Sequence, residues 1–143
     1  MIATKDITGL ILAGGRAQRM GDIDKGLIPF HGKPLIKSAI AKLKPQVQTI
    51  IINVNRNITK YASYEYSVIM DEKPDFSGLL AGFSVTLIHC KTPYLFTSPC
   101  DSPLLPSNLA ELLMAEMDRG DFQLVYASSK EVDGKIWAQP VFC

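Results

Sequence analysis

The chain has 143 residues, of which 47% are hydrophobic and 20% are charged, proportions that are ordinary for one soluble globular domain with a sizeable core. The formal net charge is only +1, so there is no strong overall field to favour nucleic acid or a membrane surface as a partner. No apolar run reaches the roughly 20 residues of a membrane-spanning helix, and the N-terminal residues lack the pattern of a signal peptide.

The first predicted element is a buried strand over residues 7–13, an apolar run that leads into Gly14 and Gly15. Adjacent glycines allow a tight turn in which backbone N–H groups approach an anion, and Arg19 and Lys25 add donors suited to phosphate. The segment matches neither the Walker A loop nor the Gly-x-Gly-x-x-Gly dinucleotide pattern. It predicts a strand-to-loop phosphate cradle, with an ordinary glycine turn beside solvated basic residues as the alternative.

The rest of the chain alternates between helical and strand patterns. The expected elements are a helix over 35–43, strands over 48–54 and 66–70, a helix over 79–89, a strand over 94–97, a helix from Pro106 to a stop at Gly120, a strand over 122–127, a turn at Asp133 and Gly134, and a strand over 137–142, for which an antiparallel direction is considered. This alternation predicts right-handed crossovers and a Rossmann-like, three-layer α/β/α sandwich with a mostly parallel sheet, formed as one domain over residues 1–143.

Polar residues follow the ends of the predicted strands. Gly14 and Gly15, Asn53, Asp71 and Asp101 each come after, or end, a different strand. Because ligands of such sheets bind beyond the carboxyl ends of the strands, we expect these residues along one edge of the sheet. For each of the three polar side chains, the alternative is a residue that only caps a turn.

Each of these polar residues suits one part of a nucleoside triphosphate. Asp101 lies between two prolines, where the backbone is stiff, and its carboxylate can hold Mg²⁺ against phosphate oxygens. Asp71 can accept two hydrogen bonds from the N1–H and N2–H₂ edge of guanine, and Asn53 offers an amide to base or ribose. Gly78, just before the helix over 79–89, can bring a helix N-terminus close to the ligand, or can be only a packing glycine at a helix start.

The three cysteines form no Cys-x-x-Cys pair, so neither a disulfide framework nor a zinc site is indicated. Free thiols suit a reducing compartment, and we expect a cytoplasmic protein. Cys100 has no histidine nearby in the sequence, which favours a small apolar packing role over nucleophilic catalysis.

Longer strings are more specific than the glycines alone. The pattern Leu-Ala-Gly-Gly-x5-Gly-x3-Lys over residues 12–25 resembles the signature loop of nucleotidyltransferases that activate a phosphorylated substrate with a nucleoside triphosphate. With Arg-Met-Gly at 19–21 and Asp-Lys-Gly at 24–26, it is most similar to the MobA-like molybdenum cofactor guanylyltransferases. Residues 99–103, Pro-Cys-Asp-Ser-Pro, resemble the metal-binding Pro-Cys-Asp-x-Pro string of the same family, and the resemblance extends over 7–140.

The resemblance implies a nucleotidyltransferase fold and transfer of GMP from Mg-GTP to the terminal phosphate of molybdopterin or of its molybdenum form, with release of pyrophosphate. Mg²⁺ is the implied cofactor, with Asp101 as its ligand, and Arg19, Lys25 and Asp101 are the expected catalytic residues. The expected partners are GTP and molybdopterin or the molybdenum cofactor, with transient contacts to cofactor-biosynthesis proteins and molybdoenzymes and none to nucleic acid or membrane. The residues expected to bind GTP are Leu12, Ala13, Gly14, Gly15, Lys25, Asn53, Asp71, Gly78 and Asp101.

The chain departs from the family pattern in three places. Relatives continue beyond this end with an Asn-x-Asn-Thr-Pro motif, so we expect a domain that lacks its C-terminal part. Leu79 and Ala17 replace a proline and a serine that are common in relatives. Two alternatives stay open. A sister transferase that uses CTP, or acts on a sugar or polyol phosphate, shares the same loop, and the missing C-terminal part favours a non-catalytic GTP-binding module.

Overall fold

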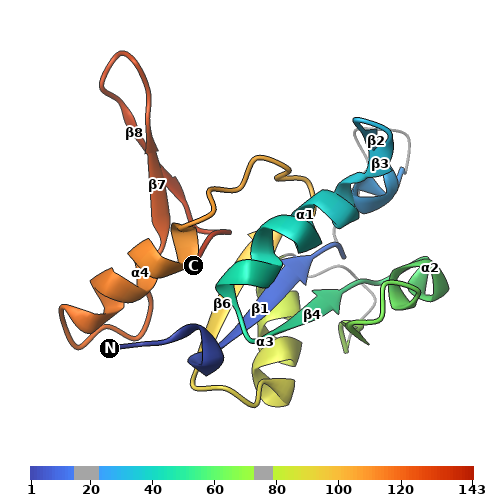
Figure 1. Cartoon of the computed structure of the whole chain (residues 1–143), viewed down its shortest axis with the longest axis horizontal. Coiled ribbons are helices and arrows are strands. Elements are labelled where there is room, and N and C mark those ends of the chain that lie inside the picture. The colour runs from blue at the N-terminus through green and yellow to red at the C-terminus, as the bar shows by residue number, and fades with distance from the viewer. Residues whose placement is uncertain (15–22, 73–78) are drawn as a thin grey trace.

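A four-stranded parallel sheet forms the centre of the computed structural model, which describes residues 1–14, 23–72 and 79–143 (Figure 1). Its strands are β1 (Ile7–Leu12), β4 (Thr49–Asn53), β5 (Ser67–Ile69) and β6 (Tyr94–Pro99), in the spatial order β5-β4-β1-β6. Leu12 pairs with Asn53 on one side and with Pro99 on the other. The carboxyl ends of β1, β4 and β6 are therefore level, and the residues that follow these strands meet at one edge of the sheet.

Helices cover both faces of the sheet, because the connections run in opposite directions. The connection from β1 to β4 contains α1 (Leu35–Leu43), whereas the connection from β5 back across to β6 contains α3 (Leu79–His89). Right-handed crossovers place two such helices on opposite faces, and Figure 1 shows α1 in front of β1 and α3 behind it. The predicted three-layer α/β/α sandwich is confirmed.

The last helix, α4 (Leu109–Asp118), joins the layer of α1 through one buried amide. The side chain of Gln46 accepts a hydrogen bond from Ala110 N at 2.9 Å and donates one to Pro106 O at 3.0 Å. Gln46 belongs to the short helix η4 (Lys44–Gln46) that follows α1, so this amide connects the ends of the two helices. The hydrophobic core accordingly contains side chains from β1, β4, β6, α1 and α4.

Several short elements were not predicted. They are η1 (Thr4–Asp6), η3 (Lys25–Leu27), the hairpin of β2 (Pro29–Phe30) and β3 (Lys33–Pro34), and α2 (Ile58–Ala62). The hairpin turns at His31 and Gly32, which both have positive φ angles of 48° and 77°, as a two-residue type I′ turn requires. No helix in the described part of the chain is long and apolar enough to cross a membrane.

The predicted strand over 122–127 is wrong. Its alternating side chains Phe122, Leu124 and Tyr126 are more than half exposed, and no strand forms before residue 127. Instead, β7 (Ala127–Lys130) pairs with β8 (Ile136–Gln139) in a separate antiparallel hairpin that projects from the body of the molecule (Figure 1). These residues therefore do not extend the sheet beyond its edge strand β6, although their sequence is compatible with a strand. The antiparallel direction considered for the last strand is confirmed.

Candidate active site

Backbone hydrogen bonds bring the expected GTP-binding residues at the end of β1 next to those of the neighbouring strands. Ala13 N donates to Asn53 O at 2.8 Å, and Cys100 N donates to Leu12 O at 3.0 Å. Gly14 and Asp101 are the next residues along their segments. The edge that the sequence predicted is thus formed by the segments that leave β1, β4 and β6.

Lys25 and Asp101 form a pair of charged side chains at the β6 side of this edge. Lys25 Nζ lies 3.6 Å from Asp101 Oδ2, and the two side chains are 46% and 39% exposed. Because both are solvated, their mutual attraction stabilises the fold little. Their side chains remain accessible to a ligand, one as a cation for phosphate and the other as an oxygen donor for a metal.

Asp24, just before Lys25, is a site residue that sequence reasoning missed. It is 8% exposed, and its carboxylate accepts hydrogen bonds from Gly26 N at 3.2 Å, from Asn57 Nδ2 at 2.9 Å and from the Tyr61 hydroxyl. The bond to Gly26 fixes the first turn of η3, from which Lys25 extends. Burial, and then the hydrogen bond to Asp24, raise the pKa of Tyr61 well above its usual value, so the phenol stays a proton donor.

Asp71 and Asn53 meet at the β5 side of the same edge. Asn53 Nδ2 donates to Asp71 Oδ1 at 2.8 Å and also to Ile69 O at 3.3 Å. Asn53 is only 3% exposed, whereas Asp71 is partly exposed. In this arrangement Asn53 holds the carboxylate, and Asp71 presents it to the outside.

Two glycines leave room for the Asn53 side chain. A Cβ atom on Gly14 would lie 2.9 Å from Asn53 Oδ1, and one on Gly82 would lie 2.6 Å from the same atom and 2.7 Å from Leu12 Cδ2. Both distances to Asn53 are shorter than real Cβ contacts allow. The backbones of the β1 loop and of α3 therefore close around Asn53, and only glycine permits this approach.

The surroundings of Cys100 do not favour a role as a nucleophile. The thiol is buried, and desolvation, followed by the charges of Asp101 and Asp24, raises its pKa to about 12. A thiol of that pKa stays protonated at neutral pH, and the reactive form of cysteine is the thiolate. The geometry agrees with the packing role that the sequence favoured.

Three predicted site residues, Gly15, Arg19 and Gly78, lie outside the described residues. The described part of the chain contains no group of three or more histidine, cysteine, aspartate or glutamate side chains that could hold a metal ion. Of the predicted site residues, Asp101 is the one expected to bind a metal, and its carboxylate is partly exposed. A carboxylate fits a hard cation such as Mg²⁺, which typically keeps several waters and is bound through one or two carboxylates together with substrate phosphates.

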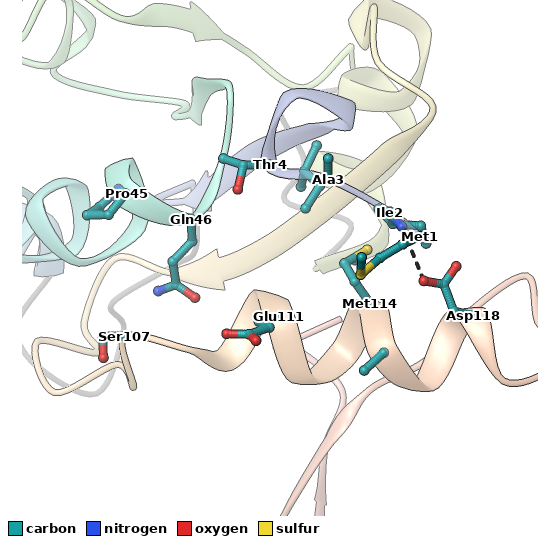
Figure 2. Close-up of a pocket in the computed structure, with 12 residues that line it drawn as sticks. Met1, Ile2, Ala3, Thr4, Pro45, Gln46, Ser107, Glu111, Met114 and Asp118 are labelled. Carbon is teal, nitrogen blue, oxygen red and sulfur yellow. Dashed lines mark hydrogen bonds between the residues drawn. The ribbon is translucent and has the colours of Figure 1, made fainter.

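An open cavity of about 880 Å³ lies elsewhere, at the start of β1 (Figure 2). Its lining includes the N-terminal residues 1–4, Ile7, Met114 and the carboxylates of Glu111 and Asp118, and no described lysine or arginine. Ile2 N donates to Asp118 Oδ2 across one side of it. Carboxylates would repel a triphosphate, so this cavity is a poor candidate for a nucleotide site.

Comparison with known proteins decides the family. The model of the MobA-like NTP transferase domain matches residues 9–142, which is nearly the whole chain. The chain belongs to the MobA-like nucleotidyltransferase family. Its resemblance to that family, its fold class and its assignment to the nucleotidyltransferases, all predicted from the sequence, are confirmed. Such enzymes generally use a divalent metal.

Named relatives agree with this assignment to the MobA-like family. The chain is 73% identical over its full length to a molybdenum cofactor guanylyltransferase of Polynucleobacter asymbioticus and 48% identical to one of Bordetella pertussis. It spans 71% and 72% of the lengths of those two proteins. A molybdopterin-guanine dinucleotide biosynthesis protein A from Archaeoglobus fulgidus shares the fold, with a TM-score of 0.67 at 21% identity over 94% of this chain and 65% of that one.

Proposed function

We propose that this MobA-like chain transfers GMP from GTP to the terminal phosphate of molybdopterin or of its molybdenum form, and releases pyrophosphate. The proposal is supported by the 73% identity to a molybdenum cofactor guanylyltransferase together with the arrangement of Lys25, Asp101, Asn53 and Asp71 along one sheet edge. The single observation that carries the transferase chemistry is the approach of Lys25 Nζ to Asp101 Oδ2, just beyond the end of β6.

Lys25 is assigned to the phosphates. Its ammonium group lies 3.6 Å from Asp101 Oδ2 at the sheet edge, and a glycine turn after β1 would add backbone N–H groups suited to bind anions. Positive charge there neutralises the triphosphate and the departing pyrophosphate, and such transfers depend mainly on positioning and electrostatic stabilisation. Arg19 and Gly15 are proposed to complete this cradle, and Gly78 to approach the ligand from the loop before α3.

Asp101 is assigned to Mg²⁺. When bound, the cation would neutralise charge on the phosphate oxygens and help to hold the triphosphate in place. A terminal phosphate is already ionised at pH 7, so its oxygen can attack the α-phosphorus of GTP without a general base. The described site accordingly offers no histidine at the sheet edge, and Cys100 is held as a neutral thiol.

Asp71 is assigned to recognition of the guanine base of GTP. Its carboxylate oxygens accept the N1–H and N2–H₂ donors of guanine, which cytosine and adenine do not present in the same arrangement. Asn53 orients this carboxylate. We also propose that the reaction takes place in the cytoplasm, where the three free cysteines would stay reduced, and that the product passes on through transient contacts with cofactor-biosynthesis proteins and molybdoenzymes.

The test is pyrophosphate release from GTP, CTP, UTP and ATP, each with Mg²⁺ and molybdopterin. We expect release with GTP that depends on the acceptor. Release with CTP instead would indicate the sister transferase. GTP binding without any release would indicate the non-catalytic module.

A further inference from the structure

One side chain links the two halves of the candidate site. Asn55 follows β4, which lies between β1 and β5 in the sheet. A residue just past β4 can therefore reach the ends of both neighbouring strands. Its side chain does so, because it contacts Gly14 beyond β1 and Asp71 beyond β5.

All the hydrogen-bonding groups of the Asn55 side chain are used in these contacts. Asn55 Nδ2 donates to Asp71 Oδ2 at 2.9 Å and to Gly14 O at 3.1 Å, and Asn55 Oδ1 accepts from Asp71 N at 3.0 Å. A primary amide has two donors and one acceptor group, so each is engaged. Asn55 thus binds both the side chain and the backbone of Asp71 and connects them to Gly14.

The Asp71 carboxylate is consequently held on both oxygens. Asn53 Nδ2 lies 2.8 Å from Oδ1, and Asn55 Nδ2 lies 2.9 Å from Oδ2. An ionised carboxylate has about four lone-pair positions, so about two remain for a ligand. The two donors are amide NH₂ groups, which cannot accept, so they fix the plane of the Asp71 carboxylate. Its remaining lone pairs then face a ligand in a defined direction.

We infer that Asn55 is a positioning residue that sets the preference for guanine, by fixing the Asp71 carboxylate against the Gly14 end of β1. This inference rests on the proposed function, because it assumes that Asp71 meets the base. Without Asn55, the carboxylate keeps Asn53 as its side-chain partner and can rotate about the bond to its Cβ atom. The two donors of guanine then lose their matched acceptors, while a base that does not use Asp71 loses little.

The test compares dissociation constants of GTP and CTP for the wild-type chain, Asn55→Ala and Asn55→Asp, by isothermal titration calorimetry. We expect the GTP-over-CTP preference to fall about tenfold in Asn55→Ala, the size of one hydrogen bond to a charged group. Asn55→Asp should lower it further, although it is nearly isosteric, because a second carboxylate cannot donate to Asp71 and repels it. Thermal unfolding of each variant verifies that it is folded.

A merely structural role gives a different pattern. It would weaken GTP and CTP equally through the lost Gly14 contact, and it would make Asn55→Ala the worse variant because alanine keeps none of the contacts. Either result overturns the inference while leaving the proposed function intact, provided that the wild-type chain prefers GTP. A wild-type chain without that preference would overturn both.

Discussion

Lys25 Nζ lies 3.6 Å from Asp101 Oδ2, so the first residue of η3 contacts the segment that follows β6. The chain contains a second pair of the same kind, Lys135 Nζ and Asp133 Oδ2 at 3.5 Å, in the β7–β8 hairpin. Both pairs are largely exposed, so neither is expected to contribute much to stability. The hairpin pair therefore provides matched control positions for the pair at the candidate site.

Replacing Lys25 should weaken GTP binding without unfolding the chain. Lys25→Ala removes a cation from the phosphates, and we expect the dissociation constant of GTP to rise about tenfold or more, since hydrogen bonds to charged groups are the stronger ones. Lys135→Ala should leave it unchanged. Fluorescence titration with a labelled GTP measures both, and equal affinities in the two variants would remove Lys25 from the cradle.

Replacing Gly82 by alanine shows whether packing or helix propensity has the larger effect on stability at this position of α3. Alanine at position 82 in α3 would stabilise an isolated helix by about 1 kcal/mol, but its Cβ would lie 2.6 Å from Asn53 Oδ1 and 2.7 Å from Leu12 Cδ2. We expect packing to dominate, so that Gly82→Ala lowers the free energy of unfolding by about 1–3 kcal/mol. Urea denaturation measures this change, and a more stable variant would show that α3 does not press on Asn53.

Tyr61→Phe tests the hydrogen bonds of Asp24, which fix the turn from which Lys25 extends. The substitution leaves the buried Asp24 carboxylate without one of its three donors, and we expect the free energy of unfolding to fall by about 1–3 kcal/mol. Tyr64→Phe is the control, because no hydrogen bond joins the Tyr64 hydroxyl to another described residue. Equal unfolding midpoints for the two variants would count against the Asp24 network.

The buried thiol of Cys100 predicts an alkaline loss of stability. Burial raises its pKa from 9.0 to about 12 in the folded chain. Between these values the unfolded chain has lost the proton and the folded chain has not, so stability that is complete below pH 9 falls as the pH rises towards 12. The raised pKa of Tyr61 acts in the same direction.

Urea denaturation at pH 8, 9 and 10 measures this effect. Cys100→Ala should lose less stability over that range than the wild-type chain, because one of the contributing groups is gone. An identical pH dependence in the two proteins would show that the thiol is not the cause.

The central fold could be predicted from the sequence because its elements are long, buried and periodic. The apolar run of β1, the β-branched run of β4 and the apolar faces of α1 and α3 each indicate one structure. The end of a strand also says where a polar residue goes, which is why Asn53, Asp71 and Asp101 were placed at one edge. The prediction of a strand over 122–127 was wrong, because a local apolar pattern does not show whether a segment pairs with a neighbouring strand.

The connections within the site could not be predicted in the same way. Asn55 reaches Gly14 and Asp71 only because β4 lies between β1 and β5, and strand order is a property of the tertiary structure. Asp24 belongs to the Asp-Lys-Gly string at 24–26, but Tyr61, its partner across 37 residues, is marked by no local pattern. An asparagine two residues after Asn53 was the one available signal, since alternate residues in an extended segment point to the same face.

The most direct test of the account is pyrophosphate release from GTP and molybdopterin, titrated with Mg²⁺, for the wild-type chain, Asp101→Asn and the control Asp133→Asn. We predict that Asp101→Asn loses Mg²⁺-dependent release while its thermal unfolding stays close to that of the wild type, and that Asp133→Asn keeps full activity. Near-normal release by Asp101→Asn would contradict the assignment of the metal, and with it the placement of the reaction at this edge of the sheet.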